Sequence, residues 1–428
     1  MLNCYYLGKH KQAILVHICF QKNHNFKDDL DEFESLVCSA GVSILNIVTG
    51  SRNTPNAKYF VGEGKANEIA EKVKNNAASI VIFNHSLSPA QERNLELLFE
   101  CSVIDRTGLI LSIFAQRART NEGKLQVELA QLSHQSTRLV RGWKHLERQK
   151  GGIGLLSGPG ETQLETDRRL LRKRINTILL RIKKLENRRE QGRLTRASIP
   201  TVLLVGYTNA GKSTLFNYLT KASVETADKL FTTLDTKIKN INIKTVGNIV
   251  LADTVGFIRD LPHHLVASFQ ATLKEIRQAT LLLHVVDASD NCINIKISSV
   301  EKVLAEINAN LISKLLVMNK IDKLNNFTPR IDRNEFNNPV SVWLSAQSGH
   351  GISLLLKALE ECLVGDITSY HLCLPPRAGR LLSYFYQLNA IEKYWIETDG
   401  SVRLIIRLPK NKWFRLCKQE VELLEYIV

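Results

Sequence analysis

Residues 201 to 214 read Thr-Val-Leu-Leu-Val-Gly-Tyr-Thr-Asn-Ala-Gly-Lys-Ser-Thr, and this stretch decides the fold. Its apolar part, Val202 to Val205, is typical of a strand buried in a parallel sheet. Residues 206 to 213 then follow the pattern Gly-x-x-x-x-Gly-Lys-Ser, which predicts a phosphate-binding P-loop. The glycines let backbone N–H groups close around an anion, and the following helix directs its positive dipole end at the phosphates.

The side chains of this loop have separate physical roles. Lys212 would reach the β- and γ-phosphates of a nucleotide, and the hydroxyl of Ser213 would bind Mg²⁺. The P-loop residues expected to contact the nucleotide are Gly206, Tyr207, Thr208, Asn209, Ala210, Gly211, Lys212, Ser213 and Thr214. We therefore predict a nucleotide site at the end of this strand.

A second motif indicates which base is bound. Asn319, Lys320 and Asp322 belong to an Asn-Lys-Ile-Asp sequence that follows an apolar strand. The carboxylate of Asp322 can accept both hydrogen bonds from the N1–H and N2–H₂ edge of guanine, whereas adenine offers no such pair of donors. Ser345 and Ala346, at the end of another strand, would add a backbone N–H to the guanine carbonyl. We expect GTP or GDP as the ligand.

A third motif, Asp253-Thr254-Val255-Gly256, follows the strand at residues 249 to 252. Asp253 would bind Mg²⁺ through water, and Gly256 would offer its N–H to the γ-phosphate. These four residues complete the P-loop side of the expected nucleotide site.

The segment from Leu230 to Asp235 lies between the P-loop and this motif, and it contains Phe231, Thr232 and Thr233. One threonine must fold over the nucleotide to complete the Mg²⁺ shell. We choose Thr233, with Thr232 as the alternative. The expected metal ligands are Ser213, Thr233 and Asp253. The expected catalytic groups are Lys212, Thr233 and Gly256.

The residue after Gly256 affects the expected rate. It is Phe257, at the position where Ras-like enzymes carry a Gln that orients the attacking water. Phenylalanine cannot hydrogen-bond a water molecule. We therefore expect slow intrinsic hydrolysis, which accelerates when a partner orders the switch segments or supplies polar groups.

Composition bounds the class of protein. The 428 residues are too many for one core, and the 44% hydrophobic content is that of an ordinary globular protein. No stretch approaches the roughly 18 apolar residues of a membrane span, and the N-terminus lacks a signal-peptide pattern. We expect a cytoplasmic protein without stable membrane insertion, with peripheral membrane association still open. The eight scattered cysteines fit reduced thiols, and the net charge of +15 favours a polyanionic partner.

The expected fold class is α/β, with several domains. Residues 1 to 118 alternate strands and helices, which predicts a small α/β domain. Residues 119 to 197 carry two heptad-like apolar stripes around a glycine-rich tip, which predicts a long antiparallel helical hairpin. Residues 198 to 366 would form the P-loop domain, a mostly parallel sheet with helices on both faces. Residues 367 to 428 would form a small α+β domain.

The polar face of the second helix of this hairpin is strongly basic. Its cationic residues outnumber nearby Glu and Asp, and they are Arg168, Arg169, Arg172, Lys173, Arg174, Arg181, Lys183, Lys184, Arg188, Arg189, Arg193 and Arg196. A rigid positive arm suits folded RNA, where phosphate and shape contacts dominate.

These motifs, with several longer ones, resemble the HflX-type GTPases of the translation-factor-related class across essentially the whole chain. The longer motifs are Tyr-Phe-Val-Gly-Glu-Gly-Lys at 59 to 65, Leu-Gln-Val-Glu-Leu-Ala-Gln-Leu at 125 to 132, Gly-Pro-Gly-Glu-Thr-Gln-Leu-Glu-Thr-Asp-Arg-Arg at 158 to 169 and Asp-Thr-Val-Gly-Phe-Ile-Arg-Asp-Leu-Pro at 253 to 262.

The resemblance implies a cytosolic GTPase that binds the large ribosomal subunit and its rRNA and splits stalled or stressed ribosomes. It implies that the hairpin tip approaches the peptidyl-transferase region. Some members use ATP through the N-terminal domain, so Gly62 to Lys65 is a candidate contact for a second nucleotide. Two departures stand out: Leu155, Leu156 and Ser157 lengthen the tip, and Thr236 replaces a usual proline. We expect a monomer off the ribosome.

Two alternatives remain open at this point. One is a nucleotide-gated regulator of a membrane protease, which the naming history of the family suggests. The other is an ATP-dependent RNA-remodelling protein.

Overall fold

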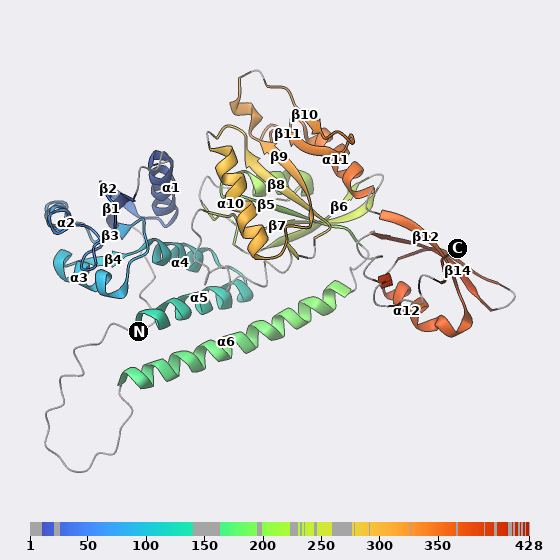
Figure 1. Ribbon diagram of the computed structural model, residues 1–428, viewed down its shortest axis with the longest axis horizontal. Coiled ribbons are helices and arrows are strands. Elements are labelled where there is room, and N and C mark those ends of the chain that lie inside the picture. The colour runs from blue at the N-terminus through green and yellow to red at the C-terminus, as the bar shows by residue number, and fades with distance from the viewer. Residues whose placement is uncertain are drawn as a thin grey trace, which may run out of the picture. The chain divides into compact units, whose positions relative to one another are not determined.

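The structure is a computed structural model, and it describes residues 11–20, 26–139, 163–194, 199–222, 230–231, 233–234, 236–243, 246–258, 276–277, 279–290, 292–325, 327–364, 367–388, 390–397, 400–409, 413, 416–417, 420, 423 and 425–427 (Figure 1). The chain divides into two compact units. The first comprises Met1–Lys183, Ala227–Asp235 and Asp260–Phe269. The second comprises Lys184–Thr226, Thr236–Arg259 and Gln270–Val428.

The first unit contains a four-stranded parallel sheet with the strand order β2-β1-β3-β4. Its strands are β1 (Gln12–Phe20), β2 (Ser43–Arg52), β3 (Ile80–Phe83) and β4 (Ser102–Ile104). Its helices are α1 (Phe26–Ser39), α2 (Glu63–Asn75), α3 (Pro89–Phe99) and α4 (Arg106–Arg117). Every residue of β3 is buried, as expected for a parallel sheet with both faces covered.

Local capping explains where two of these helices begin. The hydroxyl of Ser88 accepts the N–H of Gln91 at 3.3 Å, and the Gln91 side chain accepts the N–H of Ser88 at 2.9 Å, with Pro89 in the first helical turn. Asp105 caps α4 by accepting the N–H of Gly108 at 2.7 Å.

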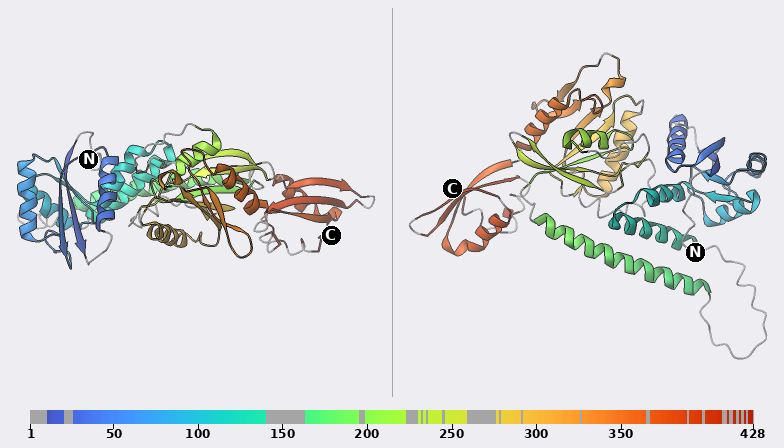
Figure 2. Two further views of the ribbon diagram at one scale, coloured as in Figure 1. Left: turned by 90° about the horizontal axis from the view of Figure 1, so that it is seen from above. Right: turned by 180° about the vertical axis from the view of Figure 1, so that it is seen from behind.

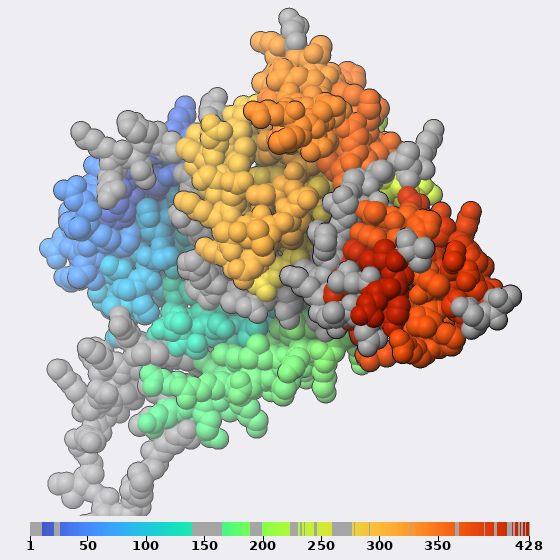
Figure 3. Space-filling model, turned by 45° about the vertical axis from the view of Figure 1, so that its right-hand side comes forward, coloured from blue at the N-terminus to red at the C-terminus, as the bar shows by residue number. Residues whose placement is uncertain are grey.

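Two long helices follow, α5 (Asn121–Leu139) and α6 (Gln163–Leu194). The first unit holds α5 and the part of α6 up to Lys183. Figure 3 shows them packed side by side. The contact is the expected apolar seam: Leu129 and Leu132 of α5 are buried against Ile178 and Ile182 of α6. The glycine-rich tip, including Leu155, Leu156 and Ser157, lies outside the described residues.

The second unit contains a seven-stranded sheet with the order β10-β11-β9-β8-β5-β7-β6. Its strands are β5 (Thr201–Gly206), β6 (Lys237–Ile243), β7 (Gly247–Asp253), β8 (Leu281–Asp287), β9 (Ser313–Asn319), β10 (Arg330–Arg333) and β11 (Pro339–Trp343). Only the edge strands β6 and β10 pair antiparallel, so the expectation of a mostly parallel sheet is confirmed. The carboxyl ends of the central strands therefore meet at one edge.

Helices cover both faces of this sheet. They are α7 (Lys212–Thr220), α10 (Ile293–Glu306) and α11 (Ile352–Val364). Leu215 of α7 and Leu355 of α11 are buried with Val202 and Leu204 in one core. Ile293 and Ile297 of α10 pack against a separate cluster that includes Val286 and Met318.

A small antiparallel sheet follows, with the order β12-β14-β13. Its strands are β12 (Ile367–Leu374), β13 (Ile391–Ile396) and β14 (Val402–Pro409), and α12 (Gly379–Gln387) lies between β12 and β13 in the chain. Figure 2 shows α12 lying along one face of these strands. Gly400, with a φ of 81°, lies in the turn of the expected hairpin between β13 and β14. Among the described residues, no helix has both the length and the apolar character needed to span a bilayer.

Gly206 offers a direct test of how the sheet positions the P-loop. Its φ is 147°, and a Cβ there would lie 2.2 Å from the carbonyl oxygen of Val285. At Gly247 the φ is 83°, but a Cβ would meet nothing within 4 Å. We expect Gly247→Ala to cost only the backbone strain of about 1–2 kcal/mol, and Gly206→Ala to cost about 1–3 kcal/mol more.

Thermal unfolding of the two variants beside the unchanged chain measures this difference. Equal losses of stability in Gly206→Ala and Gly247→Ala would contradict the close approach of β5 to β8.

Candidate nucleotide site

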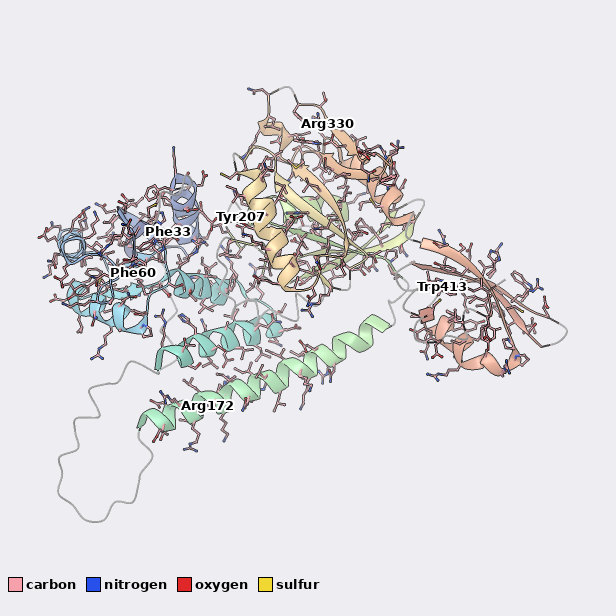
Figure 4. The ribbon with its side chains drawn as sticks, in the orientation of Figure 1. Phe33, Phe60, Arg172, Tyr207, Arg330 and Trp413 are labelled. Atoms are coloured by element: carbon pink, nitrogen blue, oxygen red, sulfur yellow. The ribbon has the colours of Figure 1, made fainter. Side chains whose placement is uncertain are left out.

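The P-loop connects β5 to α7 in a backbone conformation that only some residues accept. Asn209 and Gly211 have φ values of 60° and 90°. Gly211 is the N-cap of α7, and a Cβ there would lie 2.2 Å from Nδ2 of Asn319. Figure 4 shows Tyr207 at this end of β5. Position 211 therefore requires glycine, because Asn319 at the end of β9 occupies the space of a Cβ.

Lys212 points into this loop and is buried. Its Nζ donates to the carbonyl oxygens of Gly206 at 3.1 Å and Tyr207 at 2.6 Å. Burial lowers the pKa of Lys212 to about 8, while the nearby charge of Asp253 acts to raise it. A polyphosphate bound in the loop would supply further negative charge to this ammonium group.

Ser213 and Asp253 bring oxygen ligands together. The Ser213 hydroxyl donates to Oδ2 of Asp253 at 2.7 Å, and Asp253 is fully buried. A hydroxyl and a carboxylate are the hard oxygen ligands that Mg²⁺ takes beside phosphate oxygens, so this pair fits a magnesium ion. No group of three or more His, Cys, Asp or Glu side chains among the described residues could hold a metal by itself.

The motif after β7 lies against the P-loop. The Thr208 N–H donates to the Phe257 carbonyl at 2.8 Å, and the Phe257 N–H donates to the Gly206 carbonyl at 3.1 Å. A Cβ at Gly256 would lie 2.7 Å from Cγ2 of Thr208, so glycine is needed there. The Phe257 side chain is buried. Thr254 turns its hydroxyl back to the Leu204 carbonyl at 2.6 Å, which secures β7 to β5.

Asn319 joins the P-loop to the loop after β11. Its Nδ2 donates to the Ala210 carbonyl at 2.8 Å, and its Oδ1 accepts the Ala346 N–H at 2.9 Å. The Ser345 N–H donates to the His350 carbonyl at 2.9 Å. Both backbone groups expected to face guanine thus have protein partners, and a base would have to share the Ala346 N–H with Asn319.

The remaining residues of the guanine motif leave the Asp322 side chain open to a base from solvent. Asp322 lies in a short 3₁₀ turn, Ile321–Lys323, with its side chain exposed. Lys320 has a φ of 65° and its Nζ lies 2.8 Å from Oδ2 of Asp287. Burial acts to raise the pKa of Asp287, but the hydrogen bonds from Lys320 and Ser289 outweigh it and lower that pKa.

The motifs did not predict Asp287 or its neighbours. The chain forms a pocket between residues 207–210 of the P-loop, the end of β8 and Lys296 of α10. The Lys296 ammonium lies over the Tyr207 ring, 5.1 Å from its centroid, and contacts Asp290. Burial also lowers the pKa of His284 in this pocket to about 4, so its ring is neutral near pH 7. His284 and Asp287 belong to β8, and Lys296 belongs to α10. No motif in these elements signals a ligand.

The structure places the expected switch segment in the first unit, whereas Ser213 and Asp253 belong to the second. The Leu230 N–H donates to the Ser39 hydroxyl at 2.8 Å, at the end of α1. Phe231 packs edge-on against Phe114 of α4, with 4.7 Å between the ring centroids. Thr233 is buried, and Thr232 lies outside the described residues. The choice of Thr233 as a metal ligand stays a prediction.

A second candidate surface runs along α6. Its exposed cationic residues are Arg169, Arg172, Lys173, Arg174, Arg181, Lys183, Lys184 and Arg188. Figure 4 shows Arg172 projecting away from α5. One of these side chains, Arg174, pairs with Glu128 of α5 at 2.6 Å. The basic face that the spacing predicted is therefore on the solvent side of the helix.

The Gly-Glu-Gly-Lys sequence of the first unit begins α2. Gly62 is the N-cap, and Lys65 pairs with Glu68 at 2.9 Å within the helix. This geometry is that of an ordinary helix start, and a second nucleotide here stays a prediction.

Comparison with known families agrees with the motifs. Residues 27–115 match the family model "GTP-binding GTPase N-terminal", and residues 117–196 match "GTP-binding GTPase Middle Region". Residues 201–320 match "50S ribosome-binding GTPase", and residues 331–419 match "HflX C-terminal domain".

Individual relatives span nearly the whole chain. A GTPase HflX of Escherichia coli (strain K12) is 64% identical over 420 residues, covering 98% of both chains. A GTPase HflX of Magnetococcus marinus is 46% identical, covering 92% of this chain and 90% of the relative. A solved structure described as SsGBP and GDP complex is 25% identical, covers 83% of this chain and 99% of that one, and has a TM-score of 0.47. The chain therefore belongs to the HflX family of GTPases and is a GTP hydrolase.

Proposed function

We propose that this GTPase acts in the cytoplasm, where it binds the large ribosomal subunit through rRNA and couples GTP binding and hydrolysis to ribosome splitting or rescue under stress. The match of residues 201–320 to a 50S ribosome-binding GTPase model carries the proposal. The exposed cationic side chains of α6 support it, because phosphate contacts dominate affinity for nucleic acid.

Each group at the P-loop has a role in this proposal. The P-loop N–H groups and Lys212 hold the phosphates, and Ser213 and Asp253 hold Mg²⁺. The ion, when bound, neutralises charge that develops on the phosphates during hydrolysis. Asp322 accepts the guanine edge, while Asn319 keeps the loops around it in place.

The geometry also supports regulation of the rate by a partner. Phe257 is buried and offers no hydrogen bond to the attacking water, so that water needs another polar group. Leu230 and Phe231 of the expected switch segment contact Ser39 at the end of α1 and Phe114 of α4. We propose that the ribosome supplies or orders the polar groups that position the attacking water. We also propose that the four domains expected from the sequence act together in ribosome-stimulated hydrolysis.

The first prediction concerns stimulation of hydrolysis. The isolated protein should hydrolyse GTP slowly, and purified large subunits should raise the rate by a factor approaching the ~10³ typical of partner-stimulated GTPases. Arg172→Glu/Arg181→Glu should abolish the stimulation and leave basal hydrolysis unchanged, because neither arginine belongs to the motifs that form the nucleotide site. The matched control is Lys302→Glu/Lys357→Glu, which changes the same charge on exposed lysines of α10 and α11. Fast hydrolysis without subunits would count against the proposal.

The second prediction tests guanine recognition. In Asp322→Asn the side-chain amide can donate one hydrogen bond, which suits the additional carbonyl of xanthine better than the amino group of guanine. We expect affinity to shift from GTP to xanthosine triphosphate, measured by competition against a fluorescent nucleotide. Glu335→Gln removes an exposed charge elsewhere in the same unit and should leave the preference for GTP intact. Unchanged GTP affinity in Asp322→Asn would remove Asp322 from the site.

The third prediction uses the pKa of Lys212, which burial lowers to about 8. Near pH 8.5 much of this amine is neutral, and a bound polyphosphate favours its charged form, so GDP binding should take up a proton. Calorimetry in two buffers of different ionisation enthalpy measures this uptake. Affinity should fall as the pH rises above about 8, because protonation then costs free energy. Lys212→Arg keeps the charge at all these pH values, so any residual binding should show no proton uptake.

A further inference from the structure

The C-terminal sheet has one face that α12 does not cover, and we name it the open face. Along β14 the side chains of Leu404, Ile406 and Leu408 are buried, whereas those of Arg403 and Arg407 between them are exposed. Alternation along a strand therefore assigns the arginines to the open face. The pairing register adds residues that lie opposite positions 403, 405 and 407 on the neighbouring strands, namely Ser369, His371, Cys373, Lys393 and Trp395.

The opposite face of this sheet is a closed core. Phe385 of α12 is fully buried there with Leu404 and Ile406. Trp413 stacks on Tyr370 of β12, with 3.9 Å between the ring centroids, and belongs to the same core. Figure 1 shows α12 on one side of the strands, and Figure 4 shows Trp413 near that side. The described C-terminal residues in this core thus pack on the covered face.

The open face is positively charged. Lys393, Arg403 and Arg407 are exposed. The positions paired with residues 403, 405 and 407 hold no Asp or Glu, and one carboxylate, that of Glu397, reaches this face from the end of β13. Glu397, just beyond β13, pairs with Arg403 at 2.6 Å. Both side chains are partly exposed, and such surface pairs contribute little to stability, so a phosphate can compete for the guanidinium. The two arginines are four positions apart, a distance of about 13 Å along the strand.

The open face also carries flat rings. Trp395 lies opposite Arg403 and is 44% exposed, which is unusual for the largest apolar side chain. His371, opposite Ile405 on β12, is exposed as well. Aromatic rings interleaved with arginines on a sheet surface are the arrangement on which unpaired bases stack while cations hold the backbone.

We propose that the open face binds single-stranded RNA. Trp395 stacks on a base, Arg403 and Arg407 contact phosphates more than one nucleotide apart, and Lys393 adds charge beside them. An acidic protein segment could use the same charges, but it would give the Trp395 ring no planar partner. The proposal deepens the proposed function, because it assigns an rRNA contact separate from α6. An RNA oligomer free of ribosomes tests it independently of subunit binding.

The test uses the full chain and a mixed-sequence RNA oligomer of about 12 nucleotides that contains 4-thiouridine, a site size within the range of one binding module. After irradiation, mass spectrometry identifies the crosslinked peptides. We expect crosslinks in β13 or β12, at or beside Trp395 and His371. Trp395→Ala should weaken RNA binding by roughly tenfold through the lost stacking, and Trp395→Phe should restore part of it. Tyr384→Ala, an exposed aromatic on α12, is the matched control.

A second pair of variants measures how much the arginines of the open face contribute to RNA affinity. Arg403→Ala/Arg407→Ala should lower affinity and reduce the slope of log affinity against log salt by about 1.4, which corresponds to two phosphate contacts on a single strand. Arg377→Ala/Arg380→Ala removes the same charge from exposed residues on the covered side and should change neither. Circular dichroism of each variant confirms that the sheet is intact.

Three outcomes would overturn the proposal. Crosslinks confined to α6 would assign the RNA contact to the helix alone. Unchanged affinity in both the Trp395 and the Arg403/Arg407 variants would show that the open face binds no RNA. Loss of large-subunit binding by the Arg403/Arg407 variant with unchanged RNA binding would identify a protein partner instead. If RNA binds as expected while large subunits fail to stimulate hydrolysis, only the proposed ribosomal function is wrong.

Discussion

The side chain of Asn319 is the interaction on which the nucleotide site depends. Its amide bonds to Ala210 in the P-loop and to Ala346 after β11, so three segments from separate strands meet at one buried group. Gly211 is needed because the same amide occupies the space of a Cβ. Buried amides with all partners satisfied fix geometry strongly, since losing one partner leaves another polar group without a hydrogen bond.

The parallel sheet makes this meeting possible. β5, β7, β8, β9 and β11 point the same way, so the residues that follow them gather at one edge. The buried apolar side chains of these strands hold that edge of the sheet in place. The pairing of the strands sets the distances between the polar groups that follow them. The groups that we propose for phosphate, metal and base recognition are thus brought together by one packing arrangement.

Local patterns in the sequence were sufficient for several of these features. The P-loop, the seam of α5 and α6, the mostly parallel sheet and the hairpin at Gly400 all follow from residue types at short spacing, and the structure has each of them. Local patterns could not predict the partner of the Ala346 N–H, because its acceptor, Asn319, lies 27 residues away in the sequence. The pocket at Lys296 and the packing of Phe231 on Phe114 depend on tertiary contacts that no local pattern encodes.

The hydrogen bond between Leu230 and Ser39 joins residues 191 positions apart, and it belongs to a unit that is discontinuous along the chain. During synthesis, α1 and the first sheet emerge long before their last contact segment. At about 5–20 residues per second, this delay is on the order of 10 to 40 s. The contacts of Leu230 with Ser39 and of Phe231 with Phe114 are therefore absent from every nascent chain for that time.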